Sequence, residues 1–87
     1  MTRTIGRMML PAMTVLGSLR VGETAEVVAV EGEGPITVRL LEMGFVPGSR
    51  VAVVKAAPFG DPLELRLRGY HVSLRKAEAS RVQVKRT

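Results

Sequence analysis

Polar and hydrophobic residues alternate most regularly along residues 63–68, which read Leu-Glu-Leu-Arg-Leu-Arg. A period of two is typical of a β-strand with one face in the core and the other in water. After Gly69 the alternation resumes, and it places Val72 and Leu74 on the inner face. The two strands are therefore predicted to form a hairpin that turns at Arg68 and Gly69.

Shorter patterns predict the other strands. Residues 23–30 are rich in Val and Ala at alternating positions, and residues 50–57 are apolar on both faces, as expected of a central strand. A helical turn over 75–79 and a last short strand over 81–84 complete the pattern. The inward positions of all elements predict a core made of Val27, Leu40, Val51, Val53, Leu65, Leu67, Val72, Leu74 and Val82.

One short helix is predicted over residues 36–43. Ile36, Leu40 and Met43 recur at helical spacing and are expected on its inner face. Gly44 follows directly, and glycine readily takes the left-handed conformation that ends a helix. The helix is therefore predicted to stop at this glycine.

Glycine and proline mark the predicted turns. Pro47 presets the first position of a tight turn, and Gly48 tolerates positive φ at the second. We expect positive φ at both Gly44 and Gly48 for this reason. The residues assigned to turns are Gly44, Pro47, Gly48, Gly60, Asp61, Pro62 and Gly69.

About five short strands with tight turns and one or two short helices predict a mainly β fold. A small sheet of this kind exposes unpaired edges unless it curls on itself into a barrel. The chain has 87 residues, enough for one domain with a thin core and no cleft between lobes. Residues 1–12 are expected to be a flexible N-terminal extension, and residues 13–87 the folded domain.

Three segments resemble one known family. Residues 39–48 are similar to its helix and Pro-Gly turn, residues 59–63 to its Gly-Asp-Pro turn, and residues 69–79 to its last hairpin strand and helical turn. This is the FeoA family, small proteins that accompany the FeoB ferrous-iron transporter. The resemblance covers roughly residues 15–84. Because the matching residues are structural, they identify the fold better than the mechanism.

The resemblance implies an SH3-like barrel, a cytoplasmic location and a non-enzymatic role. It further implies that the chain binds the cytoplasmic face of an FeoB-like membrane GTPase and modulates its activity. Arg3 and Arg7 precede an apolar stretch that looks like a signal peptide, but Pro11 interrupts this stretch and no cleavage site follows. The stretch is also too short to span a bilayer.

The residues themselves offer little chemistry. The chain has no Cys, which excludes a disulfide framework and thiolate metal sites. His71 is the sole His, and on the outer side of its strand it is more typical of a surface residue than of a metal ligand. No acid, base and nucleophile occur in a catalytic pattern. We therefore predict no catalytic residue, no resident metal and no cofactor.

Charge is distributed unevenly along the chain. Residues 1–44 contain four Arg and five Glu, whereas residues 45–87 contain nine Lys or Arg and three acidic residues. The formal net charge of +5 thus arises in the C-terminal half. Such a surface suits an acidic protein, phospholipid head groups or nucleic acid, and it is equally typical of a plain solvated surface.

Four basic residues and two aromatic ones are candidates for partner binding. Arg66 and Arg68 share the wet face of one strand, and Arg75 and Lys76 follow its hairpin partner, so a single basic patch is expected. Phe59 and Tyr70 lie beside turns, where each is predicted to plug the barrel. The alternative is an interface anchor, since aromatic residues beside arginines are favoured at interface hot spots.

A regulatory or nucleic-acid-binding module is the main alternative function, because basic SH3-like barrels also bind RNA and resemble domains of metal-dependent repressors. Against it, the sequence shows no helix-turn-helix and no series of aromatic residues on which bases could stack. The nucleic-acid alternative is therefore the less favoured one.

Overall fold

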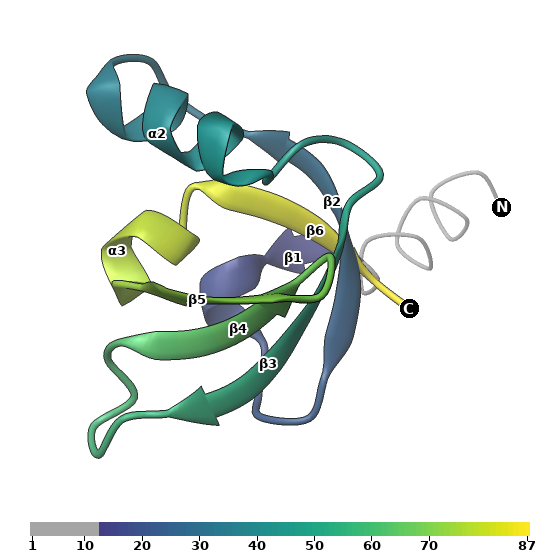
Figure 1. Ribbon diagram of the computed structural model, residues 1–87, viewed down its shortest axis with the longest axis vertical. Coiled ribbons are helices and arrows are strands. Elements are labelled where there is room, and N and C mark those ends of the chain that lie inside the picture. The colour runs from purple at the N-terminus through teal and green to yellow at the C-terminus, as the bar shows by residue number, and fades with distance from the viewer. Residues whose placement is uncertain (1–12) are drawn as a thin grey trace, which may run out of the picture.

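The computed structural model describes residues 13–87, and the expected extension over residues 1–12 lies outside the described residues. Six strands form one antiparallel sheet in the order β1-β6-β2-β3-β4-β5 (Figure 1). The strands are β1 (Met13–Val15), β2 (Thr24–Val30), β3 (Arg50–Ala56), β4 (Leu63–Leu67), β5 (Tyr70–Leu74) and β6 (Val82–Arg86). The helical elements are the 3-10 turn η2 (Leu16–Ser18) and the α-helices α2 (Pro35–Met43) and α3 (Lys76–Ala79).

The predicted mainly β class is confirmed, with two corrections to its details. The sheet has six strands rather than about five, because the three residues of β1 pair with the C-terminal strand β6. A three-residue strand is too short to show alternation, so the sequence pattern missed it. The sheet is also not a closed barrel, since the two edge strands β1 and β5 do not pair with each other.

Helical packing takes the place of the missing strand pair. The turn η2 follows β1, and α3 follows β5, so each edge strand leads directly into one of these elements. At Gly17 the two backbones lie so close that an added Cβ would come within 3.4 Å of the Lys76 carbonyl oxygen. The sheet therefore curls until η2 and α3 meet, which reduces the exposed edge without closing the hydrogen-bond ladder.

The core lies on the concave face of this curled sheet. Every predicted core residue is buried except Val72, which is half-buried in the middle of the edge strand β5. The sequence patterns did not assign Leu16, Leu19 and Phe45 to the core, yet all three are buried there. Phe45 is among the largest side chains that are completely enclosed.

The helix α2 ends as predicted. Gly44 has φ 114° and donates its N–H to the carbonyl oxygens of Leu40 and Leu41, and Gly48 has φ 92°. The prediction that Ile36 lies on the inner face of the helix is wrong, because this side chain is 39% exposed. Thr37 and Leu40 form the buried face instead, so the helix is rotated away from the orientation that its apolar spacing predicted.

Candidate partner-binding surface

The convex face of the sheet carries Arg66 at the centre of a row of side chains. Strand register places Arg66 between Ala52 of β3 and His71 of β5, and Ala52 in turn pairs with Thr24 of β2. Arg68 has φ 52° and Gly69 has φ 91°, so these two residues form the tight turn of the predicted hairpin. Both arginines are exposed.

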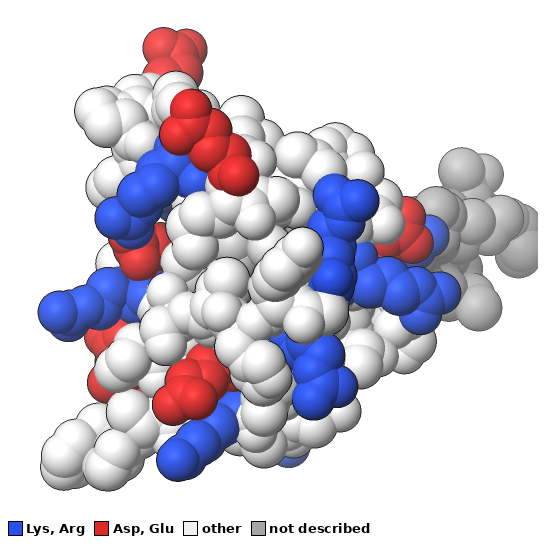
Figure 2. All heavy atoms as spheres, in the orientation of Figure 1, with Lys and Arg blue, Asp and Glu red and all other residues white. Residues whose placement is uncertain are grey.

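Arg50 joins these two arginines, although no pattern in the sequence pointed to it. The N–H of Arg68 donates to the carbonyl oxygen of Arg50 at 3.3 Å, which places the turn beside the start of β3. All three arginines border a hollow of about 200 Å³, whose remaining lining is Thr24, Val51, Ala52 and Gly69. We call Arg50, Arg66 and Arg68 the arginine site. Figure 2 shows basic side chains gathered on the side of the molecule where β2 and the β4–β5 turn lie.

A second hollow adjoins the first. It has a volume of about 480 Å³ and lies over the Pro47–Gly48 turn. Its lining residues are Val46, Pro47, Gly48, Ser49, Arg50 and Arg68. Because Arg50 and Arg68 border both hollows, these two side chains form a cationic ridge between them.

The arginine site has no internal counter-ion. Within residues 13–87 the ion pairs are Arg39–Glu78 and Arg86–Glu23, and neither includes an arginine of the site. No acidic side chain lines either hollow. The nearest acidic residue by strand register is Glu26, opposite Arg50 on β2. The three guanidinium groups are therefore available to an external anion.

Arg75 and Lys76 do not join this site, so the prediction of one basic patch is wrong. Leu74 pairs with Leu63 at the far end of the hairpin, whereas Arg66 pairs with His71 near the turn. Arg75 therefore lies about four residues further along the sheet than Arg66, a separation of roughly 13 Å. The alternation of polar and apolar residues placed Arg66 correctly on the outer face of β4, with Arg68 in the turn that follows it. The hairpin, however, holds these two arginines at one end and Arg75 and Lys76 at the other.

Neither candidate aromatic residue plugs the fold. Phe59 is 103% exposed and Tyr70 is 76% exposed, so the predicted plugs are wrong and Phe45 fills the core instead. Phe59 projects from the β3–β4 loop, where Gly60 donates its N–H to the Ala57 carbonyl oxygen at 2.7 Å. The exposure of Phe59 and Tyr70 is compatible with the alternative prediction, in which they anchor an interface with a partner.

The Gly60-Asp61-Pro62 turn stabilises the contact between the β3–β4 loop and α3. The carboxylate of Asp61 accepts a hydrogen bond from the backbone N–H of Lys76 at 3.0 Å, at the first residue of α3. It thereby satisfies a backbone donor that a short helix leaves unpaired. Pro62 accepts a hydrogen bond from the N–H of Ala57 at 3.1 Å, which closes the loop. This turn thus fixes the hairpin to the helical turn that follows it.

The described part of the chain offers no metal centre. Residues 13–87 contain no group of three or more His, Cys, Asp or Glu that could hold an ion. His71 is exposed on the outer face, as its position in the alternation predicted. Among the described residues, no helix has the length and apolar character needed to cross a membrane.

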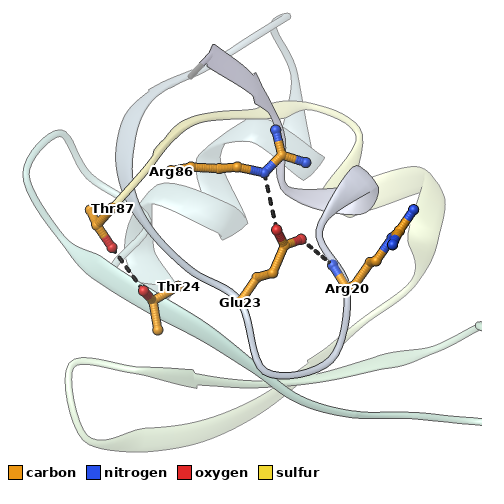
Figure 3. Close-up of polar contacts among 5 residues, drawn as sticks. All are labelled: Arg20, Glu23, Thr24, Arg86 and Thr87. Carbon is orange, nitrogen blue, oxygen red and sulfur yellow. Dashed lines mark hydrogen bonds and ion pairs between the residues drawn. The ribbon is translucent and has the colours of Figure 1, made fainter. Parts of the chain in front are cut away.

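The start of β2 is tied to the end of β6 by a polar cluster (Figure 3). Glu23 accepts hydrogen bonds from the backbone N–H of Arg20 at 2.7 Å and from Nε of Arg86 at 3.2 Å. The hydroxyls of Thr24 and Thr87 lie 2.8 Å apart. The hydrogen bond from Arg20 is the main cause that holds the pKa of Glu23 below its ordinary value, with Arg86 contributing and partial burial opposing.

We expect the contribution of Glu23 to stability to depend on pH. Since the folded pKa lies below the unfolded one, the carboxylate stabilises the fold above the unfolded pKa, and this stabilisation is lost as the pH falls through the folded pKa. Glu23→Gln should therefore lower the urea midpoint at about pH 7 but have little effect at about pH 3. Glu33→Gln is the control, since that carboxylate makes no ion pair within residues 13–87. A Glu23→Gln difference that stays constant with pH would contradict the assigned cause.

These features define the class of protein as a small, curled β-domain with helical turns at its edges, an architecture that one solved relative shares as an SH3 domain protein. A family model, the FeoA domain, matches residues 14–86. The chain belongs to the FeoA family, which confirms the resemblance found in the sequence.

One curated relative links this family to a transporter. The chain is 45% identical over 69 residues to the Fe(2+) transport protein A/Fe(2+) transporter FeoB fusion protein of Porphyromonas gingivalis. The match covers 79% of this chain but 8% of the fusion protein, so the chain spans only a small part of that relative. In the fusion protein, an FeoA part and an FeoB transporter belong to one polypeptide.

Solved structures agree with the fold. An FeoA-like protein from Clostridium acetobutylicum superposes with a TM-score of 0.80 at 33% identity, covering 86% of this chain and 87% of that one. The zinc-complexed FeoA of Stenotrophomonas maltophilia, described as a prokaryotic SH3 domain protein, gives a TM-score of 0.74 at 34% identity, with coverages of 83% and 89%. Both similarities extend over most of each chain.

Proposed function

We propose that this chain is a non-enzymatic accessory protein of ferrous iron uptake that binds the cytoplasmic part of an FeoB-type membrane GTPase and modulates its activity. The observation that carries the proposal is the fusion protein of Porphyromonas gingivalis, in which the related part is covalently joined to an FeoB transporter. A covalent link supplies a high effective concentration, and where the two parts are separate chains an affinity between them must take its place. That affinity requires an exposed binding surface.

The structure offers two surfaces of the right kind. The arginine site presents three cations without an internal counter-ion, and such charges steer association and fix orientation. The β3–β4 loop presents the exposed Phe59, with Arg75 and Lys76 at the same end of the hairpin. We propose that the partner contacts the arginine site first, together with Tyr70 beside its turn. The Phe59 loop is the second candidate contact.

The direct test is a titration of this chain with the soluble GTPase domain of the FeoB-type protein from the same organism. We expect a saturable complex with a micromolar or tighter Kd by isothermal titration calorimetry, and a changed rate of GTP turnover by that domain when the chain is added. The chain alone should release no phosphate from GTP.

Single-stranded RNA in the same buffers is the comparison ligand. A complex with RNA that weakens steeply with salt, together with no detectable complex with the GTPase domain, would favour the nucleic-acid alternative and reject the proposed function.

A further inference from the structure

Three arginines, and no other charged residue, border the hollow of the arginine site. The remaining lining residues are small or apolar, namely Thr24, Val51, Ala52 and Gly69. A site lined by arginines without an acidic residue lacks the partner that usually neutralises such a cluster. The site therefore has the composition of a receptor for an anionic group.

The backbone under these arginines is held by strand pairing. β3 and β4 are both interior strands of the sheet, so Arg50 and Arg66 sit on segments that are paired on both sides. Arg68 is fixed by the tight hairpin turn and by its hydrogen bond to Arg50. Because the backbone positions are set before binding, binding carries no additional entropic cost for ordering this part of the backbone.

Two hollows share the ridge of Arg50 and Arg68, and this arrangement suits two anionic groups rather than one. In an extended peptide, side chains on the same side are two residues apart, a spacing of about 7 Å. One acidic side chain could occupy the hollow over Thr24 and Ala52 while the second occupies the hollow over the Pro47–Gly48 turn. Each would lie against the ridge, where the planar guanidinium fork matches a carboxylate.

The lining favours an acidic peptide over a nucleic acid. No aromatic side chain borders either hollow, so bases would find no stacking surface within them. A pair of carboxylates needs no stacking surface, so the lining suits acidic side chains better than bases.

We propose that the arginine site binds an extended acidic segment of the partner, with two carboxylates in Glu-x-Glu spacing on either side of Arg50 and Arg68. Assigning this segment to an FeoB-type protein rests on the proposed function. The chemistry of the site stands apart from that assignment, since it follows from the arginines and the hollows alone.

The test uses the full chain and an acetylated, amidated peptide, Gly-Glu-Thr-Glu-Gly, followed by amide chemical-shift titration. We expect saturable shifts at Thr24, Ala52 and Gly69, and none with the matched peptide Gly-Gln-Thr-Gln-Gly. The double change Arg50→Gln and Arg68→Gln should weaken binding by at least about tenfold, the loss expected when charge-assisted hydrogen bonds are removed. Arg75→Gln with Lys76→Gln is the control, because it removes the same charge at the other end of the hairpin and should leave binding unchanged.

Three results would overturn the inference. Shifts centred away from the arginine site would place the ligand elsewhere. An equal loss in both double variants would mean that net charge alone attracts the peptide. Displacement of the peptide by oligothymidylate at lower concentration would show that the site prefers phosphate.

The Arg50→Gln and Arg68→Gln double variant, titrated against the GTPase domain, separates this inference from the proposed function. If that domain binds the variant as tightly as the wild type, the inference fails and the function stands. If the peptide binds as expected while the domain does not bind even the wild type, the chemistry of the site stands and the proposed function fails.

Discussion

Replacing Phe45 with Ala should cost about 3–5 kcal/mol of unfolding free energy, the range for truncating a buried aromatic side chain. Phe45 is completely enclosed, and its backbone N–H donates to the Leu40 carbonyl oxygen at 3.1 Å, so the side chain is held where α2 ends. Phe45 belongs to the cluster of buried core residues, and truncating such a side chain leaves a cavity that its neighbours fill only in part. Since small domains have only about 5–15 kcal/mol of stability, the variant should lose a large part of its unfolding free energy.

Phe59→Ala provides a matched control for this measurement. It makes the same chemical change at a side chain that is 103% exposed, so the urea midpoint should stay within experimental error of the wild type. Urea unfolding followed by far-ultraviolet circular dichroism measures both variants. Equal destabilisation by the two changes would mean that the assignment of inner and outer aromatics is wrong.

The sequence predicted most of the fold because its strands have one buried face. The leucines of residues 63–68 alternate with charged residues, and the structure buries all three leucines on β4. The positive φ at Gly44 and Gly48 followed from turn chemistry in the same local way. Sequence patterns predict a structural feature correctly when the residues that determine it lie within a few positions of it along the chain.

The three aromatic side chains show where local rules fail. Phe45 and Phe59 both lie next to glycine in turns, yet one is enclosed and the other is fully exposed. The difference is set by what packs against each turn: Phe45 follows a helix that lies over the core, whereas Phe59 is at the tip of a hairpin loop. No pattern in the flanking residues carries that information.

The arginine site was predictable only in part. Arg66 and Arg68 are two residues apart on one strand, so alternation alone puts them on one face. Arg50 joins them through the pairing of β3 with β4 and the hydrogen bond from Arg68, and its position depends on a register that residues 50–57 do not specify. Arg75 and Lys76 follow the next strand in the sequence, but that strand runs away from the turn and leaves them at the far end of the hairpin.

Uptake of radioactive ferrous iron by cells lacking this chain tests the central claim most directly. With the FeoB-type transporter still present at its normal level, uptake should fall nearly to that of cells lacking the transporter, because the accessory protein would be missing from the complex. Wild-type chain supplied in trans should restore uptake, and the Phe45→Ala chain, which is expected to be strongly destabilised, should restore less. Undiminished uptake in cells that lack the chain and retain the transporter would contradict the account.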